Sequence, residues 1–309
     1  MKSVMVNRAN RALVLAPKPE LYAAFPDAPR LRIKGKERLI LPHNEDTTRV
    51  ARELGYDAPA PIAVYYDWDS VNPPAFNAQI ITGSMMTLMK RAYVLNDMGT
   101  GKTRTALWAF DWLKRVKRAN RLLVVAPLST LHRVWVREIM AAVPHLRYAV
   151  LHGTAARRLE LLESDVDIFI VNHDGVGILR SALSRRKDID VFVLDELAVY
   201  RNGSSQRSRI MRDLAASRPY VWGMTGSPTP QAPTDAWAQA KIVTPWTVPE
   251  PMQRFRERTM VKVTSFKWAP RENAAAIVRN VLQPSVRFTM DDVVELPDVV
   301  YRFFTVDKS

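Results

Sequence analysis

The sequence contains no cysteine and no long apolar run. Without cysteine there is no disulfide, thiolate metal site or cysteine nucleophile, and the composition fits a reducing compartment. The apolar stretch 12–16 is shorter than the apolar core of a signal peptide, and no run of about 18 apolar residues indicates a transmembrane helix. We therefore expect no membrane partner and a cytoplasmic or nuclear location.

Histidine and negative charge are also scarce. The five histidines show no zinc-ligand spacing, and no serine has plausible His and Asp partners for a hydrolytic triad. Lys and Arg number 45 against 31 Asp and Glu, which gives a formal net charge of +14. Such a field favours a polyanion such as nucleic acid as partner; a role in solubility alone is the alternative.

Residues 1–72 differ in pattern from the rest. Two short alternating pieces, 31–34 and 38–41, flank a Gly35-Lys36 step typical of a hairpin turn. A helical pattern over 46–54 ends at Gly55, and several prolines between residues 59 and 74 indicate a linker. This part is predicted to be a small α+β accessory module.

Residues 73–309 alternate short apolar runs with amphipathic helical patterns. The runs are rich in Val, Ile and Leu, as strands buried on both faces should be: 92–95, 122–126, 148–151, 168–171, 191–194 and 220–224. Helical spacing falls at 104–116, 130–142 and 206–216. These units predict an α/β domain with a parallel sheet and helices on both faces, and ligands bind such sheets at the carboxyl ends of the strands.

The segment NDMGTGKT, residues 96–103, follows an apolar run and opens a helical pattern. Its glycines would let backbone N–H groups turn toward phosphates at a helix N-terminus. Lys102 would reach the β- and γ-phosphates of ATP, and the Thr103 hydroxyl would ligate Mg²⁺. The strict phosphate-loop pattern has Gly where Asn96 stands, so the match is partial, and a plain strand-to-helix turn is the alternative.

Polar residues follow two further runs. A phosphate loop needs a carboxylate on a neighbouring strand for Mg²⁺, and Asp195 fits that role, while Glu196 would orient and deprotonate the attacking water. A solvated pair at a strand end is the alternative. The hydroxyls of Thr225-Gly226-Ser227 could hydrogen-bond the Asp195 region and report its state to a nucleic-acid site, and an ordinary turn is the alternative.

Taken in order, these motifs resemble the series of superfamily 2 helicases, most closely the SNF2 branch, over roughly residues 76–309. NDMGTGKT is similar to that branch's DEMGLGKT, LLVVAPLSTLHRVWVREI to its second motif and LHGTAARR to its Gly-then-Arg element. VLDELAVYRNGSSQRS resembles its DEAH segment, and MTGSPTP its TGTP motif, where RNA helicases carry SAT. VVELPDVVYRFFTVDKS resembles the segment leading out of the first lobe. The resemblance implies a RecA-like lobe of the P-loop NTPase type.

The resemblance also implies roles. Gln79 would contact the adenine, and Asp195 and Glu196 would serve the metal and the water. The nucleotide site would include Gly99, Thr100, Gly101, Lys102, Thr103 and Arg104. The nucleic-acid backbone, or its coupling to ATP, would involve Pro127, Ser129, Thr130, Asn172, His173, Thr225, Gly226 and Ser227.

Two departures from the family matter. The family's DEAH is DELA here, so Leu197 and Ala198 do not supply the histidine that links the ATP site to the TGTP motif. No second motif with an arginine finger follows Pro297. We therefore expect a first lobe that works with a second RecA-like lobe, either within a longer chain or as half of a split motor.

The stretch FPDAPRLRIKGKERLILPHNEDTTRVARELG resembles the small HARP-type DNA-binding module of some SNF2 annealing helicases. Shared features are a Pro-containing turn, Arg30, a two-strand unit ending before Pro42 and a helix, while the expected aromatic residues are missing. An unrelated accessory domain packed on the lobe is the alternative.

Three functions remain open from the sequence. The first is a DNA-dependent ATPase or translocase that couples ATP–Mg²⁺ to duplex DNA. The second is a non-catalytic DNA-binding adaptor or clamp, suggested by the missing arginine finger and the altered DELA. The third is an RNA helicase lobe, against which the TGSP motif argues.

Overall fold

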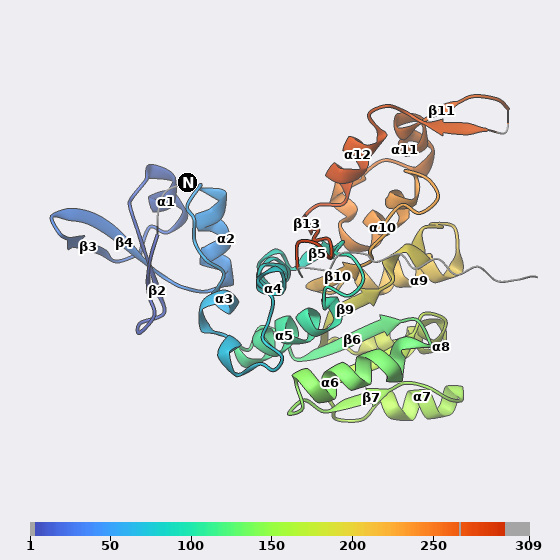
Figure 1. Ribbon diagram of the computed structural model, residues 1–309, viewed down its shortest axis with the longest axis horizontal. Coiled ribbons are helices and arrows are strands. Elements are labelled where there is room, and N and C mark those ends of the chain that lie inside the picture. Colours follow the sequence, from blue (N-terminus) through green and yellow to red (C-terminus); the bar gives the residue numbers. More distant parts are fainter. Residues whose placement is uncertain (1–3, 266, 294–309) are drawn as a thin grey trace, which may run out of the picture.

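The computed structural model describes residues 4–265 and 267–293, and its larger part is built on a seven-stranded sheet (Figure 1). The strand order is β13-β5-β10-β9-β6-β8-β7, and all neighbouring strands are parallel. The strands are β5 (Arg91–Val94), β6 (Arg121–Ala126), β7 (Tyr148–Val150), β8 (Ile168–Asn172), β9 (Ile189–Asp195), β10 (Tyr220–Met224) and β13 (Ser285–Val286). Every apolar run forms a strand within two residues of its expected bounds, so the predicted parallel sheet is confirmed.

Helices cover both faces of the sheet because side chains of each strand alternate between two apolar clusters. In β6, Leu122 and Val124 join one cluster, whereas Leu123 and Val125 join the other. The first cluster is closed by α4 (Asn77–Met89), α5 (Lys102–Arg115), η2 (Leu131–Val136) and α6 (Arg137–Ala142). The second is closed by α7 (Ala155–Leu162), α8 (Gly175–Arg185), α9 (Gln206–Ala215), α10 (Asp235–Val243), α11 (Met252–Thr259) and α12 (Ala274–Val281).

The helix expected at 130–142 is interrupted. Its first part, η2, is a π-type segment, and only α6 is regular α-helix. Such insertions re-aim side chains and occur frequently at functional sites. The segment carries Trp135, which is fully buried, and Trp108 and Trp112 of α5 are nearly fully buried.

The remaining elements of the lobe are short. They are η1 (Trp68–Ser70), η3 (Leu197–Tyr200), η4 (Pro245–Thr247) and an antiparallel hairpin of β11 (Met260–Lys262) and β12 (Trp268–Pro270). None of the helices within residues 4–265 and 267–293 is both long and apolar enough to cross a membrane.

The N-terminal part is the expected α+β module. It contains an antiparallel sheet of order β1-β2-β4-β3, formed by β1 (Met5–Asn7), β2 (Ala12–Leu15), β3 (Arg30–Ile33) and β4 (Lys36–Pro42), with α1 (Pro19–Ala24) and α2 (Glu45–Glu53). The hairpin turn falls at Lys34-Gly35, both with positive φ, one residue earlier than expected. The apolar cluster of the module spans residues 13–58, whereas Ala60 and the helix α3 (Pro61–Tyr65) pack into the larger part.

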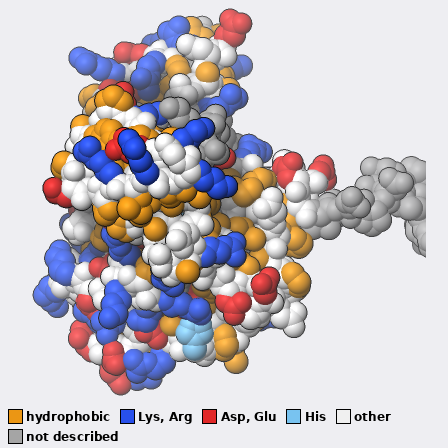
Figure 2. Space-filling view, turned by 90° about the vertical axis from the view of Figure 1, so that its left-hand side faces the viewer, with side chains coloured by type: hydrophobic (Ala, Val, Ile, Leu, Met, Phe, Trp, Pro, Cys, Tyr) orange, Lys and Arg blue, Asp and Glu red, His pale blue; other side chains and the backbone are white. Residues whose placement is uncertain are grey.

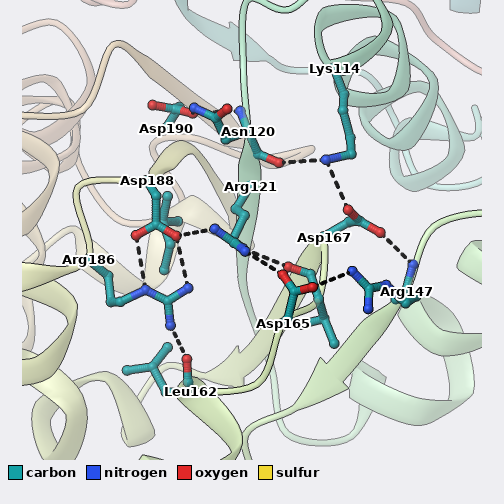
Figure 3. A network of polar contacts seen from close by, with 12 residues as sticks. Lys114, Asn120, Arg121, Arg147, Leu162, Asp165, Asp167, Arg186, Asp188 and Asp190 are labelled. Carbon is teal, nitrogen blue, oxygen red and sulfur yellow. Dashed lines mark hydrogen bonds and ion pairs between the residues drawn. The ribbon is translucent and has the colours of Figure 1, made fainter.

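Ion pairs tie the amino ends of the central strands together (Figure 3). The guanidinium of Arg121, at the start of β6, lies 2.5 Å from Asp188 and 2.7 Å from Asp165, and it also donates to the Val166 carbonyl. The guanidinium of Arg186 beside Asp188 lowers the pKa of that carboxyl to about 2. This network lies at the edge opposite the strand ends that carry the motifs, so it stabilises the sheet without contacting the candidate site.

Candidate functional site

The carboxyl edge of the sheet gathers most of the motif residues around one cleft of about 480 Å³. The loop 96–103 leaves β5, while Asp195 ends β9 and Thr130 follows β6. The predicted residues that line the cleft are Gln79, Gly99, Gly101, Lys102, Thr103, Arg104, Pro127, Thr130, Asp195 and Glu196. Residues distant in sequence therefore meet where parallel sheets bind ligands.

The loop needs its two glycines. Gly99 and Gly101 have φ of +84° and +77°, a conformation that side chains rarely adopt. A Cβ atom on Gly101 would lie 2.1 Å from Nε2 of Gln79. Gly101 is also the N-cap of α5 and provides no side-chain cap, so the first-turn N–H groups of α5 receive no bond from it.

The Lys102 ammonium lies within the loop. Its Nζ donates to the carbonyl oxygens of Asn96 and Asp97, at 2.7 and 2.8 Å. Thr100 Oγ1 also donates to the Asp97 carbonyl, at 2.8 Å. Burial lowers the pKa of Lys102, and the nearby carboxylates of Asp195 and Glu196 oppose that effect. The Lys102 ammonium is thus held by two neutral carbonyl groups, which a stronger hydrogen-bond acceptor can replace.

The two carboxylates are held differently. Trp135 Nε1 and the Glu196 backbone N–H donate to Asp195, at 3.0 and 3.1 Å. Burial raises the pKa of Asp195, and these two bonds oppose it. Glu196 is exposed and has a φ of +53°, and Oε1 of its side chain accepts from Thr225 Oγ1 at 3.3 Å. A fixed inner carboxylate and an exposed outer one suit metal binding and base chemistry.

Gln79 and Arg104 form polar contacts that the sequence did not predict. Oε1 of Gln79 accepts from the backbone N–H of Phe76 at 2.9 Å, and its Nε2 faces the Gly101 carbonyl at 3.4 Å. Arg104 forms an ion pair with Glu138 of α6 at 2.7 Å. Both side chains line the cleft, and the adenine contact of Gln79 stays a prediction.

The residues assigned to nucleic acid or coupling fall into separate groups. Thr130 Oγ1 bonds the Pro127 carbonyl at the cleft, and Ser129 is exposed beside them. Asn172 and His173 are buried. Arg158 Nη1 donates to the amide of Asn172 at 3.0 Å, whereas Nδ1 of His173 lies 3.0 Å from the Tyr200 hydroxyl.

Gly226 and Ser227 border a second cleft, of about 780 Å³, between the loop after β10 and α12. Thr225 is 1% exposed and, as the partner of Glu196, connects this loop to the first cleft. The DELA residues Leu197 and Ala198 are buried, and a Cβ on Gly223 would lie 2.5 Å from Leu197 Cδ2. The buried Ala198 stands at the position of the family's histidine, while Glu196 contacts Thr225 directly.

Sequence reasoning missed the support of Asp195 by Trp135 and of Asn172 by Arg158. Nothing in the spacing of Trp135 shows that its indole N–H reaches a strand end. The segment 293–309, which resembles the family's exit from the first lobe, lies outside the described residues except for Val293.

The loop, its lysine and the paired carboxylates fit a nucleoside triphosphate with Mg²⁺. The positive-φ glycines leave the backbone of the loop accessible, and the hydroxyl of Thr103 and the carboxylate of Asp195 are hard oxygen ligands on one cleft. Within the described part of the chain, no group of three or more His, Asp or Glu side chains could hold a metal alone. Phosphate oxygens would have to complete the coordination of Mg²⁺.

This fold and this loop define a RecA-like lobe of the P-loop type. The SNF2-related domain model matches residues 85–307, and the chain belongs to that family. The chain is 27% identical over 183 residues to the ATP-dependent helicase fft1 of Schizosaccharomyces pombe, covering 54% of this chain and 19% of that protein. It is 26% identical over 156 residues to the ISWI chromatin-remodeling complex ATPase ISW1 of Saccharomyces cerevisiae, covering 48% and 14%.

A solved structure shows the same fold. The Sulfolobus solfataricus SWI2/SNF2 ATPase core in complex with dsDNA matches with a TM-score of 0.58 and 22% identity, over 71% of this chain and 45% of that chain. The chain therefore spans less than half of that core and under a fifth of the two curated relatives. The predicted first RecA-like lobe of an SNF2-type protein is thereby confirmed.

Proposed function

We propose that this chain is the ATP-binding lobe of a DNA-dependent ATPase that couples ATP–Mg²⁺ binding and hydrolysis to duplex DNA. The observation that carries the proposal is that Lys102, Asp195 and Glu196 line one cleft together with Gly99 and Gly101, the two positive-φ glycines of the loop. Mg²⁺ bound with ATP would offset the phosphate charge. The residues of the chain then have separate tasks.

Lys102 would exchange the carbonyls of Asn96 and Asp97 for phosphate oxygens, which are stronger acceptors for an ammonium. Asp195, positioned by Trp135, would serve the metal as a carboxylate. Glu196 reaches into the cleft and would take the proton of the attacking water. Its bond to Thr225 supplies a route by which the loop after β10 could sense this step.

Charge supports DNA as the partner. The net charge is +14, and Figure 2 shows Lys and Arg side chains spread over the face of the molecule that carries the N-terminal module. Five cations of the β3–β4 hairpin take part in no ion pair among the described residues: Arg30, Arg32, Lys34, Lys36 and Arg38. The similar solved structure is that of an ATPase core in complex with dsDNA. We propose that residues 1–72 act as a DNA-binding accessory module and residues 73–309 as the motor lobe.

The test is ATP turnover with and without duplex DNA, using the wild type, Lys102→Ala and the matched control Lys187→Ala, whose side chain is exposed away from the cleft. We expect DNA-stimulated turnover that Lys102→Ala abolishes and Lys187→Ala leaves unchanged. Turnover by this lobe alone should be slow, because an arginine finger from a second lobe contributes about 10³–10⁵ in rate.

The other candidates predict different results. If ATP and DNA bind but turnover stays absent when a second lobe is supplied, the chain is an adaptor rather than a motor. If RNA displaces duplex DNA at equal concentration, the RNA helicase alternative is favoured. Phosphate contacts should dominate DNA binding, so affinity should fall steeply with salt, and a flat salt response would contradict the proposal.

A further inference from the structure

Asn96 occupies the position where the strict phosphate-loop pattern has Gly, and this residue is 2% exposed. Its Nδ2 donates to Thr82 Oγ1 of α4 at 3.1 Å. Its Oδ1 accepts from the backbone N–H of Phe288 at 3.0 Å. The same residue offers its backbone carbonyl to Lys102. One buried amide therefore joins α4, the phosphate loop and a segment almost 200 positions further along the chain.

That segment, residues 284–290, continues the sheet beside the phosphate loop. The backbone N–H groups of Tyr93, Leu95 and Asp97 donate to the carbonyls of Pro284, Val286 and Phe288, at 2.9, 2.8 and 2.9 Å. The third bond lies beyond the end of β5, inside the loop itself. The ladder of hydrogen bonds thus extends from β5 into the loop. At Phe288 the side-chain amide of Asn96 adds a bond in the opposite direction, since it accepts from the Phe288 backbone N–H.

Met290 supports the loop from the same segment. A Cβ on Gly99 would lie 2.8 Å from Met290 Sδ. Met290 does not line the 480 Å³ cleft, although Gly99 does. The side chain therefore packs on Gly99 without occupying the cleft, and residues 284–290 brace the loop rather than block it.

We infer that Asn96 is a positioning residue that couples the phosphate loop to residues 284–290, so that nucleotide in the loop and the placement of this segment depend on each other. A change in the loop that moves Asn96 or Asp97 must break their bonds to Phe288 or move Phe288 with them, since both residues bond it directly. The inference rests on the proposed function for its ligand, but the bonds of Asn96 and Asp97 to Phe288 do not depend on that ligand.

The test combines hydrogen–deuterium exchange with binding of a fluorescent ATP analogue. Asn96→Ala removes both side-chain bonds, whereas Asn96→Asp keeps an acceptor for the Phe288 N–H and matches the Asp of the family's loop. We expect Asn96→Ala to speed exchange in peptides covering 91–100 and 284–292 and to weaken analogue binding about tenfold. Asn96→Asp loses only the bond to Thr82 and should restore most of both. Asn120→Ala, which loses a bond to Asp190 at the opposite edge, should change neither.

Nucleotide should slow exchange at 284–292 more in the wild type than in Asn96→Ala, which keeps only the backbone bond from Asp97 to Phe288. The inference is overturned if Asn96→Ala matches the wild type, if Asn96→Asp behaves like Asn96→Ala, or if exchange rises throughout the protein. If Asn96→Ala does not fold, Met290→Ala tests whether residues 284–290 affect nucleotide binding through Gly99: weaker analogue binding is expected, and unchanged binding would overturn the coupling. Failure of the wild type to bind the analogue would contradict the proposed function. Hydrogen–deuterium exchange without nucleotide would still decide whether Asn96 connects the loop to residues 284–290.

Discussion

Acidification should destabilise the folded chain through His173, which is 7% exposed and packs against Tyr200. Burial, with a contribution from the charge of Arg207, lowers the pKa of His173 to about 4. An unfolded histidine titrates near 6.5, so the unfolded chain binds the proton more readily than the folded one. The contribution of His173 to the free energy of unfolding is therefore fully present above pH 6.5 and is lost as the pH drops toward 4.

The size of the effect follows from the two pKa values. Their difference corresponds to about 3.4 kcal/mol once the pH is well below 4. Applying the linkage relation between pH 8 and pH 5 gives a loss of about 2 kcal/mol from this group. That is a large fraction of the stability of an ordinary domain.

The assay is urea unfolding at pH 8 and pH 5 for the wild type, His173→Asn and His152→Asn. Asn can keep a hydrogen bond to the Tyr200 hydroxyl but does not titrate, and His152 is exposed. His173→Asn should lose about 2 kcal/mol less than the wild type between the two pH values, whereas His152→Asn should follow the wild type. Any packing cost of the substitution is the same at both pH values and cancels. Equal losses in the wild type and His173→Asn would refute the reasoning.

Two further predictions concern the cleft. Trp135→Phe removes a donor to Asp195, so the pKa of that carboxyl should rise further, the acid limb of turnover should move to higher pH and turnover at pH 7 should fall about tenfold. Trp108→Phe is the matched control, because Trp108 is equally buried and its Nε1 has no partner in the described part of the chain; an equal shift in both pH profiles would contradict the role of the bond. Gly101→Ala should weaken binding of an ATP analogue more than tenfold, since its Cβ meets a side-chain amide at 2.1 Å in addition to about 1 kcal/mol of strain at positive φ. Gly35→Ala has a similar φ and open space around it, so unchanged analogue binding by both variants would show that the clash is absent.

Much of the site could be predicted because it depends on local pattern. Apolar runs of Val, Ile and Leu fixed the strands, and polar residues directly after them had to lie at the carboxyl edge of a parallel sheet. Lys102, Asp195 and Glu196 therefore converge as expected. The ladder that adds β13 was not predicted, because two residues carry no periodic signal.

The sequence by itself determined which residues reach the edge of the sheet: glycines where φ must be positive, a lysine at a helix start and carboxylates at a strand end. Only the tertiary structure decided how these residues are supported. Trp135 reaches Asp195 through a π-type segment, and Asn96 bonds Phe288 192 positions away. Such contacts depend on how separate elements pack and on the need of buried polar groups for partners, which no spacing along the chain records.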